Sequence, residues 1–261
     1  MEFFKGLIYK ELKLTKNWFV VGIALLILGV VAGLGLTKYF NEPNIFAVVA
    51  VTILVGHGFY LPAYLLHSLN IEAQTQLWLH NPNSGAILFF AKLTAGFILY
   101  VVSFFIALVI AIWGLTHAVN GESLFNLTGE PVLNITLIGL GITLGTLFLG
   151  VWVLFYWSLF HSLKKVPFLH SIRWPIVIGT WILLTAIGNY VNNLPIYQKL
   201  KNIGIIKLDA YSIEFLVGKS SASAGFVDNA ELSIMNGAIY TILVIIVFSA
   251  SVWLLERKVE V

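Results

Sequence analysis

The sequence predicts an all-α polytopic membrane protein, with six transmembrane helices preceded by an amphipathic N-terminal elbow helix. Hydrophobic residues make up 59% of the 261 residues, charged residues make up only 10%, and the mean hydropathy is +0.93. These values lie far outside the range of soluble domains. Six long apolar runs follow a charged N-terminus, and a membrane-spanning helix needs about 20 apolar residues. We therefore expect a single transmembrane domain over residues 1–261.

The elbow helix is expected over residues 2–16, which are too charged to cross a membrane. Its apolar residues recur at helical spacing, and lysines fall on the opposite side: Phe3, Phe4, Leu7, Ile8, Leu12 and Leu14 against Lys5, Lys13 and Lys16. The pattern predicts a helix in the headgroup layer, with its phenylalanines in the acyl boundary and its lysines toward anionic lipid. A cleaved signal peptide is the alternative, although no small-residue cleavage site follows.

Glu11 falls near the apolar side of this helix, where an unpaired carboxylate is costly. It should find a lysine or a backbone donor. The simplest expectation is a surface neighbour of Lys13 and Lys16.

The six spans are expected at residues 18–36, 45–66, 88–115, 132–160, 174–190 and 235–255. Gly29 and Gly33 have the Gly-x-x-x-Gly spacing that lets two helices approach closely, and Gly56 and Gly58 offer the same possibility in the second span.

Basic residues set the orientation of the spans. Most flank one side of the membrane, and only Lys38 lies in the short loops of the other side. Cytoplasmic loops carry an excess of lysine and arginine, so both termini are expected in the cytoplasm. The large extracellular loop then covers residues 191–233. It should hold short interfacial helices, beginning at Leu194–Ile203, and a mobile hinge at Ser220–Gly225.

The sequence predicts no catalytic residues and no metal ligands. It lacks cysteine, zinc-helix and nucleophile-elbow motifs, and its apolar runs contain no carboxylate for an intramembrane protease or a proton relay. His57 is the one titratable group well inside a span. A packed, hydrogen-bonded residue is the favoured interpretation of His57, and a place with Tyr60 on a translocation path is the alternative.

Two further motifs are incomplete. Gly218-Lys-Ser220 lacks the earlier glycine of a phosphate-binding loop, so no nucleotide is expected on this chain. Asn81-Pro82-Asn83 is half of an aquaporin signature and occurs once, which leaves a water channel as a weak alternative. The net charge of +3 is an orientation signal, so no nucleic acid is expected as a partner.

The most polar stretch between two spans runs from Ile71 to Gly85. Leu77, Trp78 and Leu79 can form an apolar knob for a partner, while Pro82 stops a helix and Ser84 can cap the next one. The alternative is an ordinary turn with an interface tryptophan. Glu72 is expected either to pair with a partner or to brace Lys92 within the same hairpin.

The chain resembles the membrane subunits of ABC-2 type exporters. The resemblance rests on Tyr9-Lys-Glu-Leu-Lys13 in the elbow and, in the first cytosolic loop, on Glu72, Thr75, Leu77, Trp78, Leu79, Pro82, Ser84, Ile87 and Lys92. Gly85 departs from the pattern, since a basic residue often follows the serine. The resemblance implies that Glu72, Thr75, Leu77, Trp78, Leu79, His80, Pro82 and Ser84 couple to an ATPase, and that the elbow acts through Lys5, Glu11, Lys13 and Lys16.

The resemblance also implies the partners. Two copies of a separate ATPase subunit would bind ATP and Mg, this chain would bind no cofactor and would not be an enzyme, and it would pair with itself or with a similar permease. The absence of charge inside the spans suits an amphipathic or apolar cargo, a peptide or a lipid-like compound, in a bacterial cell membrane whose lipids the chain contacts. A stand-alone immunity or scaffold protein and an unrecognised membrane enzyme remain alternatives.

Overall fold

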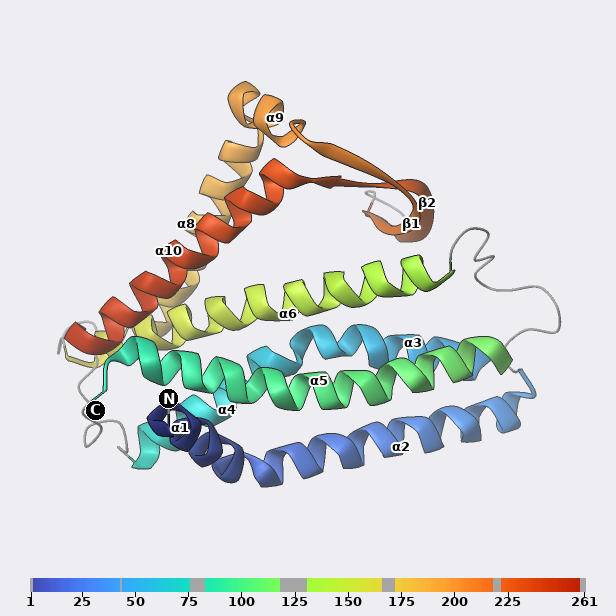
Figure 1. Cartoon of the computed structure of the whole chain (residues 1–261), viewed down its shortest axis with the longest axis horizontal. Helices are drawn as coiled ribbons and strands as arrows, with labels where there is room; N and C mark the ends of the chain where they lie inside the picture. The colour runs from blue at the N-terminus through green and yellow to red at the C-terminus, as the bar shows by residue number, and fades with distance from the viewer. Residues whose placement is uncertain are drawn as a thin grey trace. The chain divides into compact units, whose positions relative to one another are not determined.

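The structure is a computed structural model, and it describes residues 2–42, 44–75, 83–117, 131–165, 172–217 and 222–258, without the side chains of 115–117, 131–137, 165, 206–232 and 258. In this part of the chain six helices are long and apolar enough to cross a membrane. This confirms the predicted helical multi-pass membrane class. The elements are α1 (Glu2–Leu14), α2 (Lys16–Phe40), α3 (Asn44–Gly56), η1 (His57–Phe59), α4 (Tyr60–Thr75), α5 (Gly85–His117), α6 (Pro131–Ser162), η2 (Leu163–Lys165), α8 (Arg173–Asn192), α9 (Pro195–Lys201), β1 (Ile205–Val217), β2 (Ala222–Ser233) and α10 (Ile234–Lys258) (Figure 1).

The chain divides into two compact units, which are described separately. Unit 1 contains residues 1–126, 141–173 and 247–261, and unit 2 contains residues 127–140 and 174–246. Unit 1 therefore holds α1 to α5 together with most of α6 and the second half of α10.

Helix α2 lies against α3 in the manner that its glycines predict. It ends where Asn41 takes the left-handed conformation at φ 57°, a common way to stop a helix. A Cβ atom on Gly29 would lie 3.0 Å from Ile53, and one on Gly33 would lie 3.1 Å from Val49. The Gly-x-x-x-Gly prediction is thus confirmed as packing within the chain. Gly56 and Gly58 make no such approach within the described chain, because a Cβ at either position would meet nothing within 4 Å.

The second span is broken at its middle by the 3₁₀ turn η1. Proline in a helix removes one backbone donor and clashes with the carbonyl four residues earlier, so Pro62 prevents regular helix through Gly58. The backbone N–H of Leu61 instead donates to the Thr146 hydroxyl of α6, at 3.3 Å. A side chain of a neighbouring helix therefore satisfies the backbone at the break, as a membrane interior requires.

Helix α4 is the centre of the core of unit 1. Its buried residues Leu61, Tyr64, Leu65 and Leu69 form one cluster with buried residues of α5, α6 and α10. Two glycines on neighbouring helices allow α4 to pack closely. A Cβ on Gly96 of α5 would lie 2.5 Å from the Tyr64 ring, and one on Gly150 of α6 would lie 3.2 Å from Leu61 and Leu65. The position of α4 is therefore fixed from two sides.

The elbow helix α1 packs on protein, which corrects one prediction. Phe4 and Leu7 contact Leu88 and Ala91 of α5, and Ile8 and Leu12 pack against the cluster around α4. The apolar stripe was expected in lipid, but it is used for docking on α5. Lys5, Lys13 and Lys16 lie on the exposed side, as predicted.

Unit 2 contains an antiparallel hairpin that the sequence analysis did not foresee. Strands β1 and β2 pair from Ile205 opposite Ser233 to Val217 opposite Ala222. Helix α9 agrees with the predicted helix at 194–203, but interfacial helices beyond it, and a hinge over 222–225, are wrong. Alternating residues such as Ile213, Glu214 and Phe215 suit a strand, and that period-two signal was missed. The hairpin closes where the Ile234 N–H donates to the carbonyl of Gly204, whose φ is +69°.

The close approach of α4 and α5 can be tested at Gly96. Gly96→Ala should lower the free energy of unfolding by about 1–3 kcal/mol, because the new methyl group overlaps the Tyr64 ring. Gly35→Ala is the matched control: a Cβ there meets nothing within 4 Å, and alanine is the better helix former. The measurement is the melting temperature of the detergent-purified protein. Equal melting temperatures for the two variants would contradict the packing.

Candidate functional site

The candidate site is a buried network of charges that joins α1, α4 and α5. Helix α1 supplies Lys10 and Glu11, α4 supplies Glu72, and α5 supplies Lys92. Each of the last three lies on the buried stripe of its own helix: Glu11 follows Leu7 by four residues, Glu72 follows Leu65 by seven, and Lys92 follows Leu88 by four. Helix packing therefore brings these charges together.

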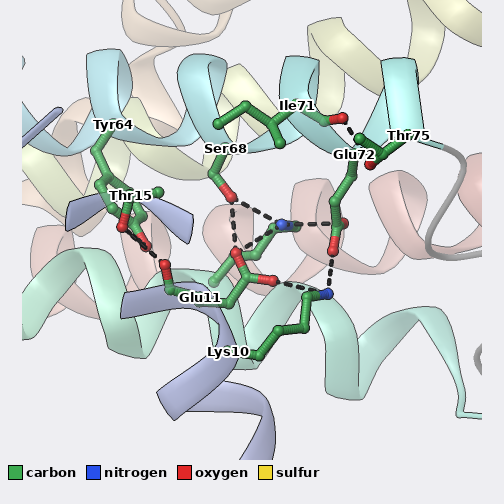
Figure 2. A network of polar contacts seen from close by, with 9 residues as sticks. Lys10, Glu11, Thr15, Tyr64, Ser68, Ile71, Glu72 and Thr75 are labelled. Carbon is green, nitrogen blue, oxygen red and sulfur yellow. Dashed lines mark hydrogen bonds and ion pairs between the residues drawn. The ribbon is translucent and has the colours of Figure 1, made fainter. Parts of the chain in front are cut away.

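The Lys92 ammonium is the centre of this network. Figure 2 shows Glu11, Ser68 and Glu72, its three partners, with their polar ends turned toward one another. Its Nζ lies 2.8 Å from Oε2 of Glu11, 2.9 Å from Oε2 of Glu72 and 2.7 Å from Oγ of Ser68. The Ser68 hydroxyl donates onward to Oε2 of Glu11 at 2.8 Å. Lys92 therefore donates hydrogen bonds to Glu11 and Ser68, whereas its contact with Glu72 is an ion pair without hydrogen-bond geometry.

Lys10 lies at the partly exposed edge of the network and pairs with both carboxylates. Its Nζ lies 3.3 Å from Oε1 of Glu11 and also binds Oε1 of Glu72. Two carboxylates thus face two ammoniums, and the network is neutral. Lys92, Glu11 and Glu72 are each at most 2% exposed, so their mutual pairing is what makes their burial tolerable.

Two of these groups lie in α1, outside the spans, and their pKa values are shifted toward the charged forms. Burial by itself raises the pKa of the Glu11 carboxyl, but the Lys92 and Lys10 ammoniums and the Ser68 hydroxyl outweigh burial and hold that pKa below its ordinary value. Burial lowers the pKa of Lys10, but Glu72 and Glu11 outweigh it and raise that pKa. Both groups are therefore ionised over the physiological range.

Neutral contacts hold α4 at two further points, Tyr64 and Asn70. The Thr15 hydroxyl donates to the carbonyl of Glu11 at 2.8 Å and lies 3.5 Å from the Tyr64 hydroxyl. On the α6 side, the indole N–H of Trp157 donates to Asn70 at 3.1 Å. The end of α4 is therefore tied to α1, α5 and α6.

Three of the residues predicted to couple to an ATPase lie in the described chain. Glu72 braces Lys92, which confirms one of the two expectations for it. The Thr75 hydroxyl donates to the carbonyl of Ile71 at 2.8 Å, in the last turn of α4. Ser84 directly precedes α5, and its carbonyl accepts from Leu88 N–H at 3.2 Å. Leu77, Trp78, Leu79, His80 and Pro82 fall outside the described residues.

The expectation for Glu11 is corrected. Its partners are Lys92, Lys10 and Ser68, and not the exposed Lys13 and Lys16 that stand near it in sequence. Ser68 was missed altogether, and Lys10 was named only as part of the Tyr9–Lys13 motif, without a partner. A charge on the apolar stripe of a helix was the available signal, because such a charge demands a partner from the helix that covers the stripe.

Gly85, the departure from the exporter pattern, has a structural reason. Its N–H donates to Oε1 of Glu256 in α10 at 2.7 Å, and a Cβ there would lie 3.0 Å from Leu255. A larger residue would hold α10 away. The segment 76–84 is therefore bounded by α4, which the charge network holds, and by the start of α5, which α10 holds.

His57 and Tyr60, the residues considered for a translocation path, lie at the break of the second span. Nδ1 of His57 lies 2.8 Å from the Ile53 carbonyl, and Nε2 lies 3.0 Å from the Ser103 hydroxyl of α5. These are the contacts of a packed interhelical histidine. Neither residue contacts the charge network.

The network can position helices, and its donors and acceptors leave little capacity for chemistry. Lys92 donates to Glu11 and Ser68 and is paired with Glu72, and both carboxylates face ammoniums. Among the described residues, no group of three or more His, Asp or Glu side chains could hold a metal ion. The arrangement is that of a rigid joint.

Removing the central ammonium should destabilise the protein strongly. Lys92→Met leaves two buried carboxylates with only Lys10, and breaking a buried pair in this way costs about 3–5 kcal/mol. Lys13→Met is the control, since Lys13 is exposed on the same elbow. The double variant Glu11→Gln with Lys92→Met restores neutrality and should recover part of the loss. The measurement is the melting temperature of each purified variant. If the double variant loses as much stability as the two single variants together, Glu11 and Lys92 are not coupled, and the network is contradicted.

Acid should weaken the same joint. The folded state holds the Glu11 pKa below its unfolded value, so this contribution is complete above the ordinary glutamate range and is lost as pH falls through the folded pKa. The melting temperature should therefore drop on acidification, and Glu11→Gln should reduce the slope. An identical slope in the variant would show that other groups cause the drop.

Comparison with known proteins gives one distant relative. Over 187 residues, 70% of this chain and 72% of the relative, the chain is 28% identical to a Bacillus subtilis (strain 168) protein described as uncharacterized protein YhcE. No family model and no solved structure matches the chain. The chain is thus similar, over most of its length, to a bacterial protein whose description names no activity.

Proposed function

We propose that this chain is the membrane subunit of an ATP-driven exporter of the ABC-2 type, coupled to a separate ATPase through the cytosolic loop at residues 71–92, in which the segment 76–84 connects α4 to α5. The observation that carries the proposal is the charge network, which joins the elbow helix to the helices on both sides of that segment. A segment that receives force from a partner can transmit it only if both of its ends are firmly attached to the helices beside it.

The segment 76–84 is anchored at both ends by packed helices, which suits the transmission of force. Glu72 lies one turn before the end of α4, and Gly85 opens α5 with its hydrogen bond to α10. A push on the segment therefore moves α1, α4, α5 and α10 together. Buried ion pairs often add little stability over apolar residues. A loop that only reverses the chain direction would therefore not need ion pairs that fix the positions of three helices.

The partners in the proposal follow from the resemblance. Two ATPase copies supply ATP and Mg chemistry, two permease chains form the pathway in a bacterial cell membrane, and the cargo is an amphipathic peptide or a lipid-like molecule.

The docking part of the proposal is tested at Trp78, with the chain and a candidate ATPase subunit from the same organism produced together. Trp78→Ala should weaken ATPase association by roughly 2 kcal/mol or more, as expected for a tryptophan hot spot. Trp181→Ala, an exposed tryptophan on α8, is the control. Copurified ATPase is measured. Normal recovery with Trp78→Ala would make the segment an ordinary turn and remove the main support for the exporter.

The transmission part is tested separately by the neutral double variant Glu11→Gln with Lys92→Met. It keeps the segment and its tryptophan but loosens the joint to α1. We expect ATPase association to persist while cargo-stimulated ATP hydrolysis in liposomes falls about tenfold or more, a loss of roughly 1.4 kcal/mol in coupling. Unchanged stimulation would show that the network serves stability alone.

The proposed orientation has its own test, which the absence of cysteine makes simple. A cysteine at Ser223 in β2 should react with membrane-impermeant reagents in intact cells, and one at Ser162 at the end of α6 should not, because the lysine asymmetry places α1 in the cytoplasm. The reverse pattern would invert the topology and place the segment 76–84 out of reach of a cytosolic ATPase.

A further inference from the structure

The hairpin of β1 and β2 in unit 2 has one apolar face and one polar face. Successive residues of a strand alternate between the two faces, and cross-strand partners share a face. Three apolar pairs therefore fall on one face: Ile213 with Phe226, Phe215 with Ala224, and Val217 with Ala222. The pairs between them fall on the other face and are more polar: Ser212 with Val227, Glu214 with Gly225, and Leu216 with Ser223.

A β-bulge continues the apolar face toward the base of the hairpin. Leu208 pairs with Ala230 and Tyr211 pairs with Asp228, so two residues of β1 stand opposite one residue of β2. A shift of one residue exchanges the two faces of a strand. The apolar residues of β1 change phase at the same place, from the even positions 206 and 208 to the odd positions 211, 213, 215 and 217. The bulge therefore keeps all of them on one face, where Asp228 is the one charged residue, and it leaves the pair of Lys207 and Glu231 on the other face.

This apolar face needs a cover that unit 2 does not supply. A lone two-stranded hairpin is marginally stable in water, and its apolar face adds stability only when another surface removes it from water. Within the described part of unit 2, the two strands pack on each other, and neither packs on a helix to a similar extent. The covering surface therefore lies outside the described residues of this unit.

The base of the hairpin is fixed at the end of a helix that is apolar enough to span the membrane. Strand β2 runs from Ser233 directly into Ile234, the first residue of α10, and Figure 1 shows the hairpin joined to α9 on one side and to α10 on the other. The Ile234 N–H donates to the Gly204 carbonyl at 3.2 Å, and the Asn236 N–H donates to the Ser233 hydroxyl at 3.1 Å. The hairpin thus starts at the membrane boundary, where the bilayer is the large apolar surface within its reach.

Helix α9, which leads into β1, has the character of a segment at a lipid surface. Ile196 is 72% exposed and Ile203, just beyond the helix, is 52% exposed, and together with Leu200 they recur at helical spacing. Lys199 and Lys201 are exposed beside this stripe. Exposed apolar residues next to lysines are typical of a helix that lies in the interface and attracts anionic lipid. The same lipid surface would cover the stripe of α9 and the apolar face of the hairpin.

We propose that the hairpin lies on the bilayer at the α9 end of α8 and α10, with its apolar face in the boundary between headgroups and acyl chains. The face that contains Lys207 and Glu231 is turned to water. Helix α9 lies in the same layer, where Lys199 and Lys201 meet the phosphates of anionic lipids. This placement does not depend on the exporter assignment.

The test uses single spin labels, because the chain has no cysteine of its own. Ala224→Cys and Ala230→Cys place a label on the apolar face, and their neighbours Ser223→Cys and Glu231→Cys are the matched controls on the polar face. Each full chain is reconstituted in nanodiscs of phosphatidylethanolamine and phosphatidylglycerol. Collision of the label with an aqueous nickel chelate should be roughly threefold or more lower on the apolar face than on the polar face, and collision with oxygen, which concentrates in lipid, should be higher.

Two results would overturn the proposal. Equal access of the nickel chelate to both faces would mean that water covers the apolar face. Labels at positions 224 and 230 that are shielded from the nickel chelate and from oxygen alike would mean that protein covers it. In that case, dipolar broadening that disappears on dilution with unlabelled chain would identify a second copy as the cover.

A charge on the apolar face gives an independent check. Phe226→Asp should release the hairpin from lipid and raise nickel access at a label on position 230 to the level found at position 231. Val227→Asp, one residue further on the same strand and on the polar face, should leave the label at position 230 in lipid. A label at position 230 that stays in lipid with Phe226→Asp, or leaves it equally with Val227→Asp, would contradict the assignment of the faces.

Discussion

The interaction on which the rest of unit 1 depends is the set of three contacts made by the Lys92 ammonium. Its partners Glu11, Glu72 and Ser68 come from two other helices, so no helix of the three can turn or slide without leaving a buried charge unpaired. Apolar packing alone tolerates small shifts of a helix at a lower cost in free energy than a buried ion pair does. The network therefore fixes the position of α1 more sharply than its apolar stripe could, which matters more than any net gain in stability.

Helix α4 extends that constraint toward the membrane interior. It begins at Tyr60, directly after the break in the second span, and ends at Thr75, one turn beyond Glu72, and its core residues are enclosed by α5, α6 and α10. The break caused by Pro62 separates α4 from α3, so the two halves of the second span can differ in direction. A displacement at the Thr75 end would therefore reach the break as a movement of one rigid helix, while α3 keeps its contact with α2.

The six spans could be predicted because a bilayer imposes a length and a composition on every helix that crosses it. The Gly29 and Gly33 packing could be predicted because close approach requires small residues. The partners of Glu11 could not, since Lys92 lies 81 residues away and only the docking of α1 on α5 brings them together. The break at His57 was predictable from Pro62 but was overlooked. The hairpin was missed because the Ser and Gly residues near its turn were weighted above the alternation in Ile213, Glu214 and Phe215.

The chemistry of the network also bears on which kind of transport the chain can serve. A proton relay needs a carboxyl group that releases and regains its proton near the working pH and changes partners as it does so. Glu11 does neither, because two ammoniums and a hydroxyl hold its pKa below the ordinary value and occupy its oxygens. Such a network keeps the same geometry across the physiological range. A proton relay must change its contacts as it works, so constant geometry is a disadvantage there. A contact that transmits a displacement between helices must keep its geometry, so constant geometry is an advantage. The charge network therefore fits the proposed coupling to a partner ATPase better than it fits the use of an ion gradient.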